Sequence, residues 1–359
     1  VRRFRKNSED ATLQKTRGQK HTAETLMPAI LEIKDEFPRM GGRTLTQTLR
    51  VEHGICIPEP MANAILNIIE PEAVQARKYR KFVRRSFYTR GVNEFWCMDQ
   101  HDKMKKYGLR YHVCLEPTSG KILWLKVWWT NSNPRIVLKY FLDVVKELGC
   151  ELEAVSPTPD IPSFTMSDKG TKNNLVANIQ TLVRQELDES LDNTLLHRWM
   201  LKHGNIKPEI FWSGFRRNWA PGYEDLFEIG GFDKEGFCSP ADPTDQLVFR
   251  YLAIPWLQKQ LDRYVHRFNN TPRRASKEKT LPEGIPDLIF NDPLRYSGAD
   301  LKIEIPDLRI LQQFEDKWLP KGHPVLDLVP PEFRELADNV FIGEMRSPKI
   351  TKRKFWTTF

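Results

Sequence analysis

The chain of 359 residues is long enough for two or three domains, although length is only a soft guide. Its hydrophobic share of 40% suffices for a sizeable core, and its 28% charged residues indicate a surface with both signs. No apolar run is long enough to span a bilayer, so we expect no membrane partner. The net charge of +8 favours a polyanion such as nucleic acid, and a merely basic soluble protein fits it equally well.

The cysteines are odd in number and widely spaced: Cys56, Cys97, Cys114, Cys150 and Cys238. None forms a Cys-x-x-Cys pair, so the sequence shows no zinc finger or redox motif. We therefore expect reduced, mostly buried thiols in an intracellular compartment. The start of the chain has no apolar signal region. The first residue is Val1 and not methionine, which is compatible with a fragment of a longer product.

Three short helices are predicted after residues 1–20, a polar and basic segment that we interpret as a flexible arm. Apolar residues recur there at helical spacing, and Gly41-Gly42 is a turn signal. The pattern indicates either a helix-turn-helix domain, with Pro58 to Ile69 as its recognition helix, or an ordinary three-helix bundle. That third helix offers only Asn63 and Asn67 for base readout, so we expect it to contact mainly the DNA backbone.

A basic linker with interleaved aromatic residues is predicted at residues 73–92. Its candidate DNA-binding residues are Arg77, Arg80, Lys81, Arg84 and Arg85. Basic side chains can neutralise phosphates, and aromatic rings can pack on sugars or bases. A solvated helix face is the alternative, although clustered positive charges without acidic partners repel one another.

The sequence pattern changes at Phe95 and predicts an α/β layer arrangement. Strands are expected at 95–98, 110–115, 121–129 and 164–167. Helices are expected from about 131 to 149, 173 to 187 and 208 to 219. The C-terminal stretch is less informative, but Leu301 to Ile305 alternates like a strand.

Three acidic residues lie where strand ends and a covering helix would meet. Asp99 and Asp168 each follow a predicted strand, and Glu209 lies on a later helix. Phosphodiester transfer uses two divalent cations about 4 Å apart, held by hard oxygen ligands on rigid elements. A turn cap or plain surface charges would explain the same residues, because 47 acidic residues offer many triples. Asp102 is a second candidate, and we prefer Asp99 because it lies at the predicted strand end.

Five segments, in order along the chain, match sequence motifs of a known family. They are 95–104 (FWCMDQHDKM), 121–127 (KILWLKV), 167–173 (SDKGTKN), 205–212 (NIKPEIFW) and 251–274. Together they resemble an integrase core family related to retroviral integrases, and similar chains occur among transposon-derived genes of fungi. In that family a Trp precedes the first metal-binding Asp, as Trp96 does here, and an Asn and a Trp flank the Glu at −4 and +3.

The resemblance implies a ribonuclease-H-like mixed sheet with flanking helices, preceded by an all-α, helix-turn-helix-like domain. It implies a DNA integrase or transposase, a DDE-type polynucleotidyl transferase that performs 3′-end processing and strand transfer in the nucleus with two Mg²⁺ or Mn²⁺ ions. Asp99, Asp168 and Glu209 would be the catalytic metal ligands. Transposon ends and target DNA would be the partners, bound by a homo-oligomer, and we expect no small-molecule substrate.

On this basis we predict five parts of the chain. They are a basic arm (1–20), a helical helix-turn-helix-like DNA-binding domain (21–72), a basic linker (73–92), the ribonuclease-H-like integrase catalytic core (93–275) and a C-terminal extension (276–359). Three departures from the family pattern leave the acidic triad intact. Glu116-Pro117 replaces a usual Asp-Gly, Gly120 replaces a common Arg, and Pro208 stands directly before Glu209.

Further candidate DNA-binding residues lie near the triad. They are Lys169, Lys172, Arg216 and Arg217, for which simple solvation is the alternative. Two other functions stay open at this point. One is a domesticated, catalytically weak DNA-binding protein derived from a transposase, and the other is a ribonuclease-H-type nuclease acting on RNA–DNA hybrids.

Overall fold

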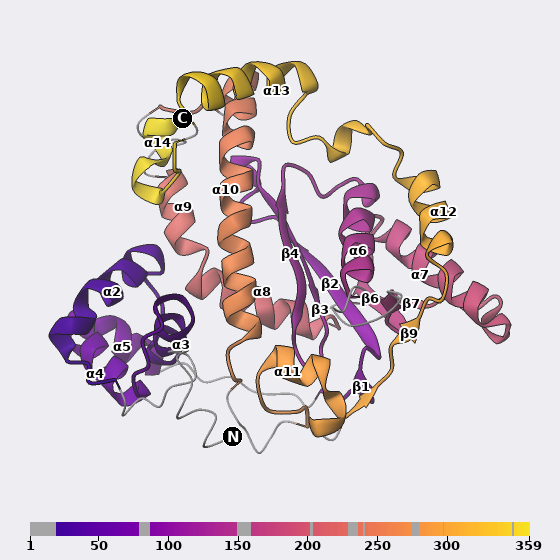
Figure 1. The fold of residues 1–359 in the computed structure, drawn as a ribbon, viewed down its shortest axis with the longest axis horizontal. Helices are drawn as coiled ribbons and strands as arrows, with labels where there is room; N and C mark the ends of the chain where they lie inside the picture. The colour runs from indigo at the N-terminus through magenta and orange to yellow at the C-terminus, as the bar shows by residue number, and fades with distance from the viewer. Residues whose placement is uncertain are drawn as a thin grey trace. The chain divides into compact units, whose positions relative to one another are not determined.

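The computed structural model describes residues 19–78, 87–148, 159–201, 204–228, 236–239, 241–273, 280–296, 298–346 and 348–359 (Figure 1). The chain forms two compact units. The first comprises Val1–Ser86 and Ser213–Phe227, and the second comprises Phe87–Trp212 and Glu228–Phe359. Each unit is described separately below. In the described part, no helix combines the length and apolar character needed to cross a membrane.

The first unit contains the predicted N-terminal helices. They are α2 (Ala23–Glu36), α3 (Gly42–His53) and α4 (Glu59–Ile69), followed by α5 (Pro71–Lys78). The side chains of Thr22 and Thr25 form a capping box that satisfies backbone donors at the start of α2. Gly54 ends α3 in the left-handed conformation with φ of 66°, which favours glycine. The sequence pattern thus predicted these three helices correctly.

The first unit also takes up the end of α8 (Ile206–Asn218) and the whole of α9 (Pro221–Phe227). Stacked rings run from Phe215 through Trp219 to Tyr223. The Tyr223 hydroxyl is 3.1 Å from Oε1 of Glu36 on α2. A segment distant in sequence thereby packs with the N-terminal helices.

The second unit is built around a five-stranded mixed sheet in the order β4-β3-β2-β6-β7. The strands are β2 (Phe95–His101), β3 (Arg110–Leu115), β4 (Ile122–Trp128), β6 (Phe164–Asp168) and β7 (His197–Met200). β2, β3 and β4 pair antiparallel, whereas β2, β6 and β7 pair parallel. This sheet and its helices confirm the predicted ribonuclease-H-like α/β class. The short strand β7 was not predicted.

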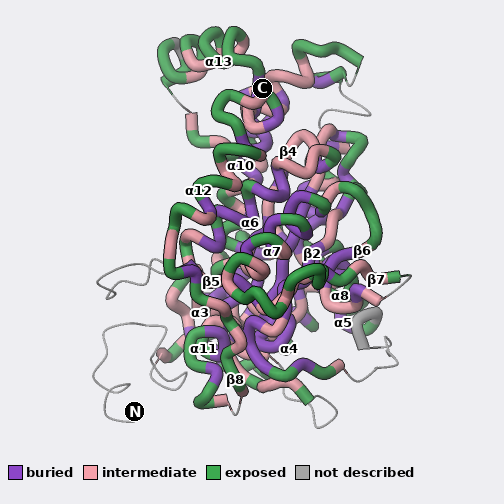
Figure 2. Tube along the Cα trace, turned by 90° about the vertical axis from the view of Figure 1, so that its right-hand side faces the viewer, coloured by how far each residue is buried: buried purple, intermediate pink, exposed green. Residues whose placement is uncertain are grey.

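The two faces of β2 have different neighbours, because side chains alternate along a strand. Trp96 and Met98 belong to the main apolar core with α6 (Pro134–Leu148) and α7 (Asn174–Leu187). Figure 2 shows this buried interior as purple segments of the sheet and both helices. Asp99 and His101 alternate with them and contact α8. The polar end of β2 is thus held against α8.

The long helix α10 (Pro243–Asn269) covers the outer edge of the sheet, alongside β4 in Figure 1. The Gln258 side chain accepts from the Val127 N–H at 3.1 Å and donates to the Leu125 carbonyl at 3.1 Å. Asn269 makes the same pair of bonds with the backbone of Ile122, each at 2.9 Å. These bonds satisfy edge groups that would otherwise be open to another strand.

The C-terminal part adds small elements around this unit. Its helices are α11 (Pro286–Asn291), α12 (Leu308–Trp318), α13 (Pro331–Asp338) and α14 (Phe355–Thr358). Two strand pairs join distant segments: β1 (Gly91–Val92) with β8 (Ala299–Asp300), and β5 (Asp160–Ile161) with β9 (Ile303–Glu304). The strand expected over Leu301 to Ile305 is therefore wrong in extent, because only Ile303 and Glu304 find a partner strand.

Short 3-10 helices and a π-helix lie between the longer elements. They are η3 (Lys105–Tyr107), η4 (Glu189–Leu191), η6 (Pro293–Tyr296), η7 (Pro324–Leu326), η8 (Asn339–Glu344) and η9 (Lys352–Lys354). Four cysteines, Cys56, Cys97, Cys114 and Cys238, are free and buried, which confirms the predicted buried thiols at those positions. Cys150 lies outside the described residues.

Candidate active site

Asp99 and Asp168 occupy equivalent places on two neighbouring parallel strands. The register of β2 and β6 pairs Met98 with Ser167, and the next residue of each strand is the aspartate. The sheet therefore brings together two residues that are far apart in sequence. One expectation was wrong: Asp99 is not the end of its strand. β2 continues to His101 because β3 pairs with it along its whole second half.

Two side chains of the Glu209 segment tie it to β2. The buried Asn205 donates from Nδ2 to the Met98 carbonyl at 2.9 Å. The Trp212 indole donates to Oδ2 of Asp99 at 3.0 Å and stacks on His101 with ring centroids 4.7 Å apart. Glu209 itself is exposed. It lies three residues before Trp212, on the same side of the helix, so these contacts direct it toward the end of β2.

The pKa of Asp99 reports how the three acids are arranged. The pKa is raised from 3.8 to about 6, chiefly by burial, and the carboxylates of Asp168 and Glu209 contribute to the rise. The backbone N–H of Gln100 and the indole of Trp212 act in the opposite direction. Both other members of the predicted triad therefore act electrostatically on Asp99.

The donor set at this point consists of carboxylate oxygens, the ligands that Mg²⁺ and Mn²⁺ prefer. A cation would also offset the repulsion by Asp168 and Glu209, which adds to the effect of burial on the pKa of Asp99. In the described part of the chain, however, no three His, Cys, Asp or Glu side chains form a group that could hold a metal ion. The adjacent aspartates fit a divalent cation, and the third carboxylate is not in a coordinating position with them.

Asp102 belongs to a different network. Its Oδ1 accepts from Nδ2 of Asn131 at 2.8 Å, and its Oδ2 is 3.4 Å from Nζ of Lys172. Burial alone would raise the pKa of Asp102, but Asn131, Lys172 and Arg110 together lower it. The predicted DNA-binding residue Lys172 is thus paired, while Lys169 beside Asp168 is exposed.

A buried chain of hydrogen bonds supports the loop after Asp168. The Trp124 indole donates to Nδ1 of His112 at 2.9 Å, so Nε2 of His112 carries the proton toward Oδ1 of Asn173 at 3.3 Å. Burial lowers the pKa of His112 to about 4 and keeps the ring neutral. Asn173 begins α7. None of these three residues was predicted from the sequence to have a functional role.

Two other predicted DNA-binding residues, Arg216 and Arg217, have partners close to them in the chain. Arg216 lies 4.0 Å from Glu224, and Nη2 of Arg217 donates to Oγ of Ser213 at 3.3 Å, both within the first unit. The side chain of Arg77 lies outside the described part, as do the linker residues Arg80, Lys81, Arg84 and Arg85.

Residues 87–290 match the family model of the integrase core domain. The chain belongs to this family. The matched stretch contains every strand of the main sheet together with Asp99, Asp168 and Glu209. The match confirms the resemblance that was inferred from the sequence motifs. No curated protein matches the chain. The family places this integrase core in the polynucleotidyl transferase superfamily, with a general integrase or transposase function, DNA as partner and divalent metal ions as usual cofactors.

Two positions at which this integrase core differs from the family pattern, Glu116 and Gly120, both lie near Arg273. Gly120 has φ of 69°, and a Cβ there would lie 1.7 Å from Nη2 of Arg273. Glu116 is fully buried and accepts from the N–H groups of Thr118 at 2.9 Å and Ser119 at 2.7 Å. It also acts electrostatically on Arg273. Arg273 thus occupies the space that the missing side chain at position 120 leaves.

Proposed function

We propose that this integrase core catalyses DNA 3′-end processing and strand transfer, with Asp99, Asp168 and Glu209 as its metal ligands. The observation that carries the proposal is the meeting of Asp99 with Asp168 on parallel strands and with the Glu209 helix through Trp212. Side chains fixed on a sheet and a docked helix hold a spacing better than loop residues would.

Each residue has a proposed part in the reaction. Asp99 and Asp168 would hold the metal ions, Trp212 orients the Asp99 carboxylate, and Glu209 would be the third ligand. Lys169, exposed beside Asp168, contacts a phosphate of the bound DNA. Two divalent ions, when bound, supply positive charge to the attacking and leaving oxygens of an in-line displacement.

We further propose that the partners are transposon ends and target DNA, that copies of the chain assemble on them, and that the protein acts in the nucleus. The family's DNA partner and the net charge of +8 support the first part. Joining two DNA ends requires two sites held together, which favours a homo-oligomer.

The decisive experiment uses the full chain, labelled duplexes and a plasmid target in Mn²⁺. Wild type should join strands, and Asp168→Asn should lower the rate by about a hundredfold or more, since several kcal/mol of charge stabilisation are lost. Asp102→Asn is the matched control, because Asp102 belongs to a separate network. Preferential cleavage of RNA–DNA hybrids over duplex DNA would replace the proposal by a ribonuclease-H-type activity.

A second candidate is a catalytically weak DNA-binding protein. The observation that favours it is that, within the described residues, the carboxylates do not form a group able to hold a metal ion. If wild type and Asp168→Asn are equally inert on every DNA substrate yet bind DNA equally, this second candidate stands.

A further inference from the structure

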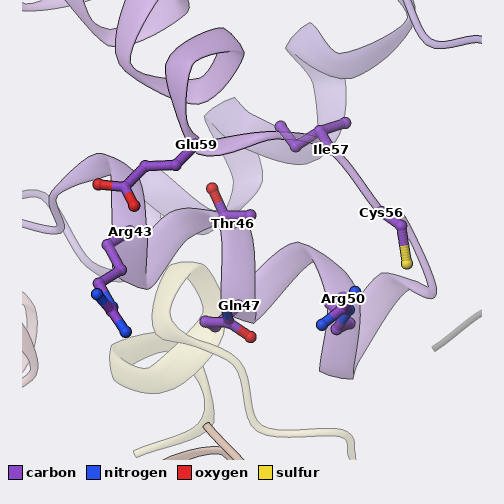
Figure 3. A pocket seen from close by; sticks show the side chains of 7 residues that line it. All are labelled: Arg43, Thr46, Gln47, Arg50, Cys56, Ile57 and Glu59. Atoms are coloured by element: carbon purple, nitrogen blue, oxygen red, sulfur yellow. The ribbon is translucent and has the colours of Figure 1, made fainter. Parts of the chain in front are cut away.

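The first unit has a polar pocket of about 250 Å³ on one side of α3 (Figure 3). Helix α3 contributes Arg43, Gln47 and Arg50 to its lining, and the turn before α4 contributes Cys56. The three α3 residues are spaced by four and then three positions, so they share one side of the helix. In Figure 3 the labelled side chains of Arg43, Gln47 and Arg50 follow one another along α3.

The other side of α3 is used for folding. Leu45, Thr48 and Leu49 are fully buried, and α3 packs against α2 and α4. Gly42 allows a close approach to α4, because a Cβ there would lie 2.0 Å from Oδ1 of Asn63. The row of Arg43, Gln47 and Arg50 is partly exposed. Its side of α3 is therefore the one open to a partner.

Some hydrogen-bonding groups of the row formed by Arg43, Gln47 and Arg50 have no partner in the described part of the first unit. Oε1 of Gln47 is buried and has no hydrogen-bond partner among the described residues. Arg50 forms no ion pair with any other described residue, and it lines the pocket. A buried amide oxygen without a partner costs free energy, which a bound ligand would recover.

Helix α4, predicted from the sequence to read bases, carries two exposed asparagines that also have contacts within the first unit. Asn63 lies against Gly42, and Nδ2 of Asn67 donates to the Asn63 carbonyl of the same helix at 2.9 Å. Ala62, Ile65 and Leu66 form the buried side of α4. The Pro58–Ile69 segment stays a prediction as recognition helix, and α3 offers a second candidate with more groups for base readout.

We propose that α3 is the helix that reads duplex DNA, with Arg43, Gln47 and Arg50 contacting base edges in the major groove. An α-helix with its side chains is about 10–12 Å wide and fits a major groove about 12 Å wide. Arginine pairs with two acceptors of guanine, and glutamine pairs with the donor and acceptor of adenine. The proposal rests on the proposed function, in which DNA is the partner.

Two neighbouring residues agree with a nucleic-acid ligand at this place. Gln19 donates from Nε2 to the Gly54 carbonyl at 3.0 Å, and its Oε1 accepts from the Cys56 N–H at 2.5 Å. These bonds fix the chain at the pocket, and the preceding sequence is rich in arginine and lysine, which neutralise phosphates. Glu59, the acidic lining residue, is of the type that accepts from the amino group of cytosine.

The test selects duplexes from a random library with the full chain in EDTA, where no strand transfer occurs. Binding is then measured by anisotropy on a selected duplex and a scrambled one. Gln47→Ala should reduce the preference for the selected duplex about tenfold and relax it at one base position. Arg50→Lys should also lose preference while the salt slope stays unchanged, because the charge remains but the fork of donors is lost. Arg39→Ala is the control, since Arg39 is exposed and outside the pocket.

The proposal is overturned if wild type shows no preference among duplexes, or if Gln47→Ala and Arg50→Lys keep the wild-type preference. It is also overturned if Arg39→Ala loses preference as much as they do, or if the chain prefers single-stranded RNA or an acidic peptide and the variants affect only that binding. Strand transfer by the same variants is measured separately in Mn²⁺. A catalytic chain without duplex preference would reject α3 as reader and leave the proposed function standing.

Discussion

The Trp212 indole N–H donates a hydrogen bond to Oδ2 of Asp99 at 3.0 Å. The two residues are 113 positions apart in sequence. This bond joins the helix that carries Glu209 to the strand that carries Asp99. It therefore orients the Asp99 carboxylate and holds the Glu209 helix against β2. It also lowers the pKa of Asp99, against the larger effect of burial.

Replacing Trp212 with Phe should impair strand transfer most at low pH. The variant loses a hydrogen bond to a charged group, worth about 1.5–3 kcal/mol, so the pKa of Asp99 should rise above its present value of about 6. The acidic limb of the pH–rate profile should move to higher pH. Trp128→Phe is the matched control, because its indole donates to the Val325 carbonyl and not to a carboxylate. Equal losses at pH 6.5 and pH 8.5 would reduce Trp212 to a packing role.

Asp99→Asn should stabilise the metal-free chain at neutral pH. The folded state raises the pKa of Asp99 from 3.8 to about 6, so it binds the proton more tightly than the unfolded state does. The free energy of unfolding of wild type should therefore fall as pH rises from about 4 to about 6, by at most about 3 kcal/mol. Urea unfolding in EDTA at pH 4.5 and 7.5 measures this.

The variant should lack that pH dependence and be more stable than wild type at pH 7.5. Asp143→Asn on the exposed side of α6 is the control, and it should keep the wild-type trend. A pH trend in Asp99→Asn as steep as in wild type would show that other groups cause it.

The periodic parts of this fold could be predicted from the sequence. The helices around Leu26, Leu45 and Ile65 and the strands around Cys97 and Val113 follow apolar spacing and turn residues. Strand β7 could not be predicted, because its four residues His197 to Met200 show no alternation and gain their structure only by pairing with β6.

The three acidic residues of the candidate site could be proposed from the sequence, but the residues that hold them in place could not. Asp99, Asp168 and Glu209 belong to sequence motifs of the family. The Trp212 hydrogen bond and the His112–Asn173 contact, in contrast, depend on tertiary packing. The −4 and +3 spacing of Asn205 and Trp212 around Glu209 was the available signal. One helical turn on each side of a glutamate places all three residues on one side of a helix.

The basic linker should make DNA affinity strongly dependent on salt. Replacing Arg77, Arg80, Arg84 and Arg85 together should lower the slope of log affinity against log salt by up to about four, since each phosphate contact contributes about 0.9. Anisotropy on one duplex at several salt concentrations measures the slope. A control variant removes four exposed basic residues elsewhere: Lys139, Lys259, Arg309 and Lys317. If both variants flatten the slope equally, the linker contributes only general charge.

Gly120→Ala should destabilise the core by about 2–4 kcal/mol, from the left-handed backbone and the contact of the new Cβ with Arg273. In an Arg273→Ala background the same substitution should cost only about 1–2 kcal/mol, because the contact is gone and the backbone strain remains. A double-mutant cycle by urea unfolding measures the difference. Additive costs would show that Arg273 does not occupy the space beside Gly120.

A crystal structure of the full chain with Mn²⁺, located by its anomalous signal, tests the proposed carboxylate site most directly. We predict manganese bound by carboxylate oxygens of Asp99 and Asp168, with Glu209 turned toward it. Crystals that contain Mn²⁺ elsewhere but none at these two aspartates, or whose carboxyl groups point apart, would contradict it.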